Sequence, residues 1–306
     1  VPHLSCPDEL ASLISSFLRH HMSEETGSVA ADVPTATAES PVQPDEYHID
    51  KRQVARSFSR AADTYDQVAH LQRAVGTELM ALLPEDHAEG VRVVDVGCGT
   101  GRFTAQLAQR YPHALTLGLD LAEGMVGHAR QHHAGAAHWL CGDAEAMPCG
   151  DGTMDLVFSN FALQWCQDLP RLMAEQYRVL RQGGRLVFST VGPGSLDELR
   201  QAWLAVDNYV HVNRFTPVER VRDALRNAGF TIRSFSVTPR ISYFHRLQDL
   251  TRELKGLGAH NVNRGRKSGL TGRSQIAALK AAYERWRTPQ GLPATWEIVT
   301  VVAEKK

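Results

Sequence analysis

Apolar and polar positions follow two periods along most of this chain. Apolar runs of strand length occur near residues 92–96, 115–120, 137–141, 154–159 and 185–190, with helical stretches between them. Strands that alternate with helices join through right-handed crossovers into a parallel sheet. The pattern therefore predicts an α/β fold.

Further elements flank this alternating region. A helical cap is expected over residues 48–83, before the first strand. After residue 190 the pattern predicts two helices and two strands, over residues 196–209, 217–228, 232–243 and 296–302. A basic helical insertion, about 246–288, separates the last two strands. Residues 48–306 are thus expected to form one catalytic domain.

The first 47 residues have a different character. Leu10, Leu13 and Phe17 recur at helical spacing, so residues 1–21 are expected to form a short amphipathic helix. Residues 22–47 have six acidic residues, three prolines and almost no large apolar residues, which favours a disordered linker. The opening Val-Pro-His-Leu-Ser-x-Pro-Asp-Glu-Leu resembles the C-terminal tail of α/β-hydrolases. Residues 1–21 would then be a remnant, and Met22 a plausible start of the catalytic protein proper. The alternative is an ordinary N-terminal helix.

Composition excludes several classes of function. The 33 basic and 34 acidic residues nearly cancel, so bulk nucleic-acid binding is not expected. The five cysteines show no zinc-site spacing and are interpreted as reduced thiols, and no metal is expected. No apolar run approaches the roughly 20 residues that span a bilayer. The expected location is the cytoplasm, without membrane contact.

A glycine-rich turn follows the first apolar strand. The strand over 91–96 runs into Gly97-Cys98-Gly99-Thr100-Gly101 and then a helix, so a ligand can approach the backbone closely. Arg102 stands where a dinucleotide fingerprint needs its third glycine, which disfavours pyrophosphate. Asp95 would repel a pyrophosphate but can anchor the loop and attract an ammonium group.

Two further acids follow the next two strands. Asp120 ends the second strand about twenty residues after the glycines, the position of a ribose-diol acceptor. Asp143 follows the third strand, where it and the Ala144 N–H can contact adenine; a helix N-cap is the alternative. A tight turn without a ligand remains the alternative for the glycines alone. Three such elements at neighbouring strand ends predict a nucleoside site.

These motifs resemble successive motifs of class I methyltransferases: Val-Val-Asp-Val-Gly-Cys-Gly-Thr-Gly, Gly-Leu-Asp-Leu-Ala-Glu-Gly-Met and Gly-Asp-Ala-Glu-Ala-Met-Pro. The resemblance implies a Rossmann-like seven-stranded sheet whose last strand is antiparallel. It also implies that S-adenosylmethionine is the cofactor. The residues that it implies for the cofactor are Asp95, Gly97, Gly99, Gly101, Asp120, Leu121, Asp143, Ala144 and Asn160.

The remainder of the domain is similar to a narrower family, the malonyl-acyl carrier protein O-methyltransferases of biotin synthesis. The shared segments include 54–62 with Tyr65, Leu71-Gln72, Leu163-Gln164-Trp165, 194–199, Asn213-Arg214-Phe215, 254–259 and 269–273. The resemblance implies methylation of the free carboxylate of a malonyl thioester. Base N-methylation is disfavoured because Ser159-Asn160-Phe161-Ala162 lacks the Pro-Pro-aromatic pattern of those enzymes.

The insertion before the last strand is locally basic. Eleven Lys or Arg residues and three acids lie between Arg240 and Thr288, whereas acyl carrier proteins are acidic. A basic docking face for malonyl-acyl carrier protein is therefore predicted, and a solvated helix surface is the alternative. Its candidate residues are Arg246, Lys255, Arg264, Arg266 and Lys267.

A malonyl carboxylate is already ionised near neutral pH, so the transfer needs positioning rather than a general base. Our candidates for the substrate pocket are Tyr65, Trp165 and Arg214, with core positions as the alternative for the two aromatic residues. A small-molecule O- or C-methyltransferase and a non-catalytic protein that binds S-adenosylmethionine are rival interpretations. The sequence does not separate a carrier-bound thioester from the coenzyme A ester.

Overall fold

A computed structural model describes residues 49–85, 90–258 and 272–306. One seven-stranded sheet has the order β3-β2-β1-β4-β5-β7-β6, in which β7 runs antiparallel to both its neighbours. The predicted α/β sheet with an antiparallel last strand is therefore confirmed. The strands are β1 (Arg92–Val96), β2 (Leu115–Asp120), β3 (His138–Cys141), β4 (Met154–Asn160), β5 (Leu180–Val191), β6 (Phe230–Phe244) and β7 (Leu292–Lys305).

Helices cover both faces of the sheet. Successive strand residues point to opposite faces, so both faces carry apolar side chains that need a cover. Val93 and Phe158 pack with Leu107 on one face, whereas Val94 and Val157 belong to the core on the other. The first face is covered by α3 and α4, and the second by α6 and α8. The helices are α2 (Lys51–Val68), α3 (His70–Met80), α4 (Arg102–Arg110), α5 (Glu123–His132), α6 (Leu169–Val179), α7 (Asp197–Leu204), α8 (Val218–Asn227), α9 (Leu247–Gly256) and α10 (Arg273–Glu284).

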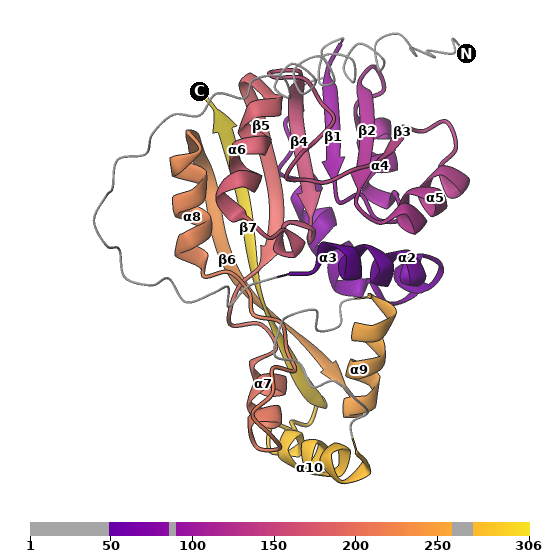
Figure 1. The fold of residues 1–306 in the computed structure, drawn as a ribbon, viewed down its shortest axis with the longest axis vertical. Coiled ribbons are helices and arrows are strands. Elements are labelled where there is room, and N and C mark those ends of the chain that lie inside the picture. Colours follow the sequence, from indigo (N-terminus) through magenta and orange to yellow (C-terminus); the bar gives the residue numbers. More distant parts are fainter. Residues whose placement is uncertain (1–48, 86–89, 259–271) are drawn as a thin grey trace, which may run out of the picture.

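Strands β6 and β7 extend far beyond the rest of the sheet, with pairing that continues to Phe244 and Leu292 (Figure 1). A second core forms around this extension and draws on α7, α9 and α10. Leu279 and Tyr283 are buried there against Trp296. The predicted insertion is thus the outer part of the same domain, below the carboxyl ends of the parallel strands.

One predicted helix is shorter than expected. The helical pattern over residues 196–209 ends at Leu204 in the structure. Asp207 Oδ1 accepts from the Tyr209 N–H at 3.1 Å and lies 2.6 Å from His211 Nε2. Such local side-chain bonds compete with helical backbone bonds, so the chain leaves the helix here.

The predicted helix and linker over residues 1–47 lie outside the described residues. No helix in the described ranges combines the length and the apolar composition that a membrane crossing needs.

The buried face of β5 provides a test of the core. Phe188 is fully buried, so Phe188→Ala is expected to lower the free energy of unfolding by about 3–5 kcal/mol, since the truncation leaves a cavity. Val237, 41% exposed on β6, is the control, and Val237→Ala is expected to change it by about 0.5 kcal/mol or less. Urea denaturation measures both, and similar losses for the two variants would contradict this packing.

Candidate active site

The loops after β1 and β2 are joined by backbone hydrogen bonds. The N–H groups of Gly97 and Cys98 both donate to the Leu119 carbonyl, at 2.7 and 3.0 Å. The Gly99 N–H donates to Asp120 Oδ2 at 2.9 Å, and the Ala122 N–H donates to Asp120 Oδ1 at 2.8 Å. Asp120 is therefore fixed at the glycine turn, as its place at the end of a neighbouring parallel strand predicts.

The glycine turn requires its glycines for steric reasons. Gly97 has φ of +74°, and a Cβ on it would lie 2.1 Å from the Ala162 Cβ. Gly101 has φ of +86°, and a Cβ there would lie 2.6 Å from the Trp139 ring. Side chains at these positions would clash and strain the backbone. Gly101 therefore packs against the protein interior at Trp139, whereas Gly97 and Gly99 line a hollow on the other side of the turn.

Two acids lie close together beneath the turn. Asp95 is buried, and its Oδ2 accepts from Thr104 Oγ1 at 2.6 Å. Burial, opposed by the Thr104 hydrogen bond and assisted by the nearby Asp120, raises the pKa of Asp95 to about 7. Burial also raises the pKa of Asp120, and the backbone donors Ala122 and Gly99 oppose that shift. Burial thus penalises the charged forms of both acids, and no cation of the described residues is among the causes that shift their pKa values.

Asp143 makes an ion pair that the sequence did not indicate. Its Oδ2 lies 2.6 Å from the Lys51 Nζ in the first turn of α2, and Lys51 also pairs with the buried Glu145. Asp143 Oδ1 accepts from the Glu145 N–H at 3.0 Å, within a tight turn rather than at a helix start. A lysine early in a helix has no distinctive spacing, so sequence alone could not assign it to this loop.

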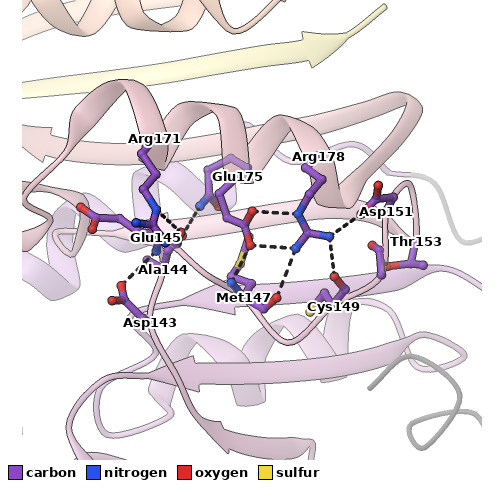
Figure 2. A network of polar contacts seen from close by, with 12 residues as sticks. Asp143, Ala144, Glu145, Met147, Cys149, Asp151, Thr153, Arg171, Glu175 and Arg178 are labelled. Carbon is purple, nitrogen blue, oxygen red and sulfur yellow. Dashed lines mark hydrogen bonds and ion pairs between the residues drawn. The ribbon is translucent and has the colours of Figure 1, made fainter. Parts of the chain in front are cut away.

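Helix α6 holds the loop after Asp143 in place. Figure 2 shows Arg178 and Glu175 reaching from α6 to the backbone of this loop. Arg178 donates to the carbonyls of Met147 and Cys149 at 3.2 and 2.8 Å, and pairs with Glu175 at 2.7 Å. Glu175 in turn accepts from the Met147 N–H at 2.6 Å. These bonds tie the loop that carries Asp143 and Ala144 to helix α6.

Two hollows meet in front of these loops. The first, here called the cofactor hollow, contains most of the residues that the sequence predicts for the cofactor: Gly97, Gly99, Asp120, Leu121, Asp143, Ala144 and Asn160. The second, the outer cavity, lies among α2, α7, α9 and β7, with mainly apolar walls such as Leu199, Val212, Leu254 and Trp296. Phe58, Tyr65, Phe161 and Trp165 line both hollows. The two hollows therefore adjoin at these four aromatic residues.

The structure brings together two of the three predicted substrate residues. Tyr65 and Trp165 belong to the shared wall, and the Trp165 ring packs edge-on against Phe58 at 5.4 Å between centroids. Burial, with Asp120 and Asp66 nearby, raises the pKa of the Tyr65 phenol, so it remains a neutral donor. Arg214 is exposed and lines a different hollow.

The remaining predictions concern Asn160 and the basic insertion. Asn160 uses its amide to join elements: Nδ2 donates to the Gln72 carbonyl at 3.0 Å, and Oδ1 accepts from Ser189 Oγ at 2.8 Å. Arg246, the N-cap residue of α9, and Lys255, in its last turn, are exposed, and Lys255 also lines the outer cavity. The other three candidates, Arg264, Arg266 and Lys267, lie outside the described residues.

Comparison with known proteins supports a methyltransferase. A family described as "methyltransferase domain" matches residues 94–188. The chain is 52% identical over 254 residues to the biotin biosynthesis bifunctional protein BioHC of Cellvibrio japonicus, covering 83% of this chain and 50% of that protein. It is 45% identical over 260 residues to the malonyl-acyl-carrier-protein O-methyltransferase of Methylococcus capsulatus, covering 84% and 94%.

Among solved structures, a putative methyltransferase from Bacillus halodurans matches with a TM-score of 0.54 at 18% identity, covering 75% of this chain and 98% of that one. Sheet order and glycine turn define a class I methyltransferase, with S-adenosylmethionine as the methyl donor. The chain belongs to the malonyl-acyl-carrier-protein O-methyltransferase family. It spans about half the length of the bifunctional relatives that it matches.

The raised pKa of Asp95 predicts a pH-dependent stability. Between about pH 4 and pH 7 the folded chain binds the Asp95 proton more tightly than the unfolded chain, so stability falls as pH rises through this window. Asp95→Asn removes that titration. We expect its stability relative to wild type to improve by up to about 4 kcal/mol between pH 4 and pH 8. Urea denaturation without ligand measures the difference, and a pH-independent difference would contradict a buried, titrating Asp95.

Proposed function

We propose that this chain transfers the methyl group of S-adenosylmethionine to the free carboxylate of a malonyl thioester carried on acyl carrier protein. The observation that carries the proposal is the meeting of two unlike hollows at one aromatic wall. The cofactor hollow combines glycines with acids, and the outer cavity is mainly apolar and has no Asp or Glu among its described lining residues. Family membership supports the same activity.

The residues of the cofactor hollow fit S-adenosylmethionine. Asp120 is proposed to accept from the ribose hydroxyls, and Asp143 with the Ala144 N–H to contact adenine. Leu121 and Asn160 would line the same hollow. The acids Asp95 and Asp120, costly in their charged forms without a ligand, suit a ligand that carries a sulfonium and an ammonium.

The outer cavity suits a carboxylate acceptor that needs no general base. Transfer forms a carbon–oxygen bond and breaks the carbon–sulfur bond, so an anion and a cation become a neutral ester and a neutral thioether. A weakly polar surrounding favours a reaction in which charge disappears. The chain's part is therefore to exclude water and to hold the acceptor oxygen in line with the methyl group.

Tyr65 and Trp165 are the residues that we propose for this alignment. Both line the two hollows at once, so both can contact a substrate at the point of transfer. The neutral Tyr65 hydroxyl can donate to one carboxylate oxygen and leave the other to react. Trp165 would close the site against water beside Phe58.

Transfer of labelled methyl from S-adenosylmethionine tests the proposed activity, with malonyl-acyl carrier protein, malonyl-coenzyme A and free malonate as parallel acceptors. We expect strong labelling of the carrier-bound substrate and little labelling of free malonate. Labelling of the two thioesters at equal efficiency would remove the role of the carrier. Labelling of none of the three, with S-adenosylmethionine binding intact, would refute the activity.

The basic face of the insertion is proposed as the docking site for the acidic carrier. Arg246 at the N-cap of α9 and Lys255 in its last turn are exposed, and Lys255 lines the outer cavity, so a carrier bound there would direct its acyl arm inward. Arg264, Arg266 and Lys267 belong to the same insertion by sequence. Arg214 lines a neighbouring hollow that shares Trp203 and His211 with the outer cavity. It adds another cation beside that cavity.

Charge reversal on α9 tests the docking proposal. The double variant Arg246→Glu, Lys255→Glu is expected to raise KM for malonyl-acyl carrier protein at least about tenfold, because repulsion replaces attraction. The small thioester malonyl-N-acetylcysteamine has no carrier, so its KM should rise much less, and only through Lys255, which lines the outer cavity that both substrates enter. Arg226→Glu on α8, where the side chain is 61% exposed, is the control. Equal losses on both substrates, or no loss with the carrier, would overturn the docking site.

A further inference from the structure

A third hollow, here called the amino-acid hollow, opens beside the glycine turn. It borders the cofactor hollow at Tyr65, Gly97, Gly99 and Asn160. Its walls include acids and cations: Asp66, Asp95, Arg73 and Arg102. A hollow lined by both positive and negative side chains suits a zwitterion. The methionine part of S-adenosylmethionine is one, because it carries an ammonium and a carboxylate.

Gln72 of α3 contributes an unsatisfied acceptor to this hollow. Its side-chain Oε1 is buried and has no hydrogen-bond partner among the described residues. A buried polar atom without a partner costs roughly 1–3 kcal/mol, and folded proteins rarely leave one. The Gln72 residue lines both the amino-acid hollow and the outer cavity.

The backbone of Gln72 is held from the cofactor side. Its carbonyl accepts from Asn160 Nδ2 at 3.0 Å, and Asn160 Oδ1 accepts from Ser189 Oγ at 2.8 Å. This chain of bonds fixes the α3 backbone against the ends of β4 and β5. The position of the Gln72 backbone, from which the side-chain amide projects, is therefore set by the sheet.

Two other acceptors of the amino-acid hollow already have partners. Asp66 Oδ1 accepts from Thr100 Oγ1 at 3.1 Å, and Asp95 Oδ2 accepts from Thr104 Oγ1 at 2.6 Å. Gln72 therefore adds a neutral side-chain acceptor that has no partner among the described residues. A neutral acceptor binds an ammonium without adding a further buried charge to a site that already holds Asp95 and Asp120.

We propose that Gln72 Oε1 accepts a hydrogen bond from the α-ammonium of S-adenosylmethionine and so positions the methyl donor at the shared aromatic wall. The proposal rests on the use of S-adenosylmethionine but not on the identity of the methyl acceptor. Gln72 thereby becomes a cofactor-binding residue contributed by the helical cap rather than by the strand ends.

Calorimetric binding of two nucleosides tests this assignment. S-Adenosylhomocysteine retains the ammonium, and 5′-methylthioadenosine lacks the whole amino-acid part. For Gln72→Leu, which keeps the size but removes the acceptor, we expect Kd for S-adenosylhomocysteine to rise about tenfold. Kd for 5′-methylthioadenosine should stay within about twofold. Gln72→Glu keeps an acceptor but adds a buried charge beside Asp95, so its Kd for S-adenosylhomocysteine should lie between those of wild type and Gln72→Leu.

The control is Gln67→Leu, the same replacement at an exposed position of α2, which should leave both Kd values unchanged. Thermal unfolding confirms that each variant is folded, and Gln72→Glu keeps the proposal testable if Gln72→Leu does not fold. Equal weakening of both nucleosides by Gln72→Leu, or no weakening of S-adenosylhomocysteine, would overturn the proposal. If Gln72→Leu weakens S-adenosylhomocysteine but not 5′-methylthioadenosine, and no malonyl acceptor is methylated, only the proposed function is refuted.

Discussion

The site depends on the anchoring of α2 across the carboxyl ends of three parallel strands. The helix is attached to the loop after each strand by a different polar contact: Asp66 with Thr100 after β1, Ser59 with Gly124 after β2, and Lys51 with Asp143 after β3. Phe58 and Tyr65 lie between these anchors and form one side of the wall shared by the two hollows. The helical cap therefore belongs to the catalytic site as fully as the sheet does.

The two hollows differ in a way that suits a charge-cancelling reaction. Acids lie beneath the glycine turn, where burial raises the pKa of Asp95 and Asp120. The outer cavity presents rings and aliphatic side chains, with no carboxylate among its described lining residues. A cation is thus favoured on one side, and an anion meets no repulsion on the other. The aromatic wall limits water at the point where the two charges would disappear.

Local sequence determined the parts of the site that lie on single strand ends. The bounds of β1 and β2 agree with the apolar runs, and Asp120 lies at the glycine turn because parallel strands end at one edge. Lys51 and Gln72 could not be assigned in this way, since their contacts arise only when a helix crosses the strands. The helix before Arg214 ends at Leu204 rather than at the predicted residue 209, and Arg214 lines a hollow that adjoins the outer cavity, so its contact with a substrate stays a prediction.

The long β6–β7 pair has an evolutionary consequence. Residues 245–291 leave the sheet after Phe244 and return to it at Leu292, and these two residues are direct partners in the ladder. Because the two ends of this insertion are paired in the sheet, the insertion can be lengthened, shortened or replaced without shifting the register of any strand. The part of the outer cavity that α9 contributes, including Leu254 and Lys255, can thus change while the glycine turn between β1 and α4 remains constant.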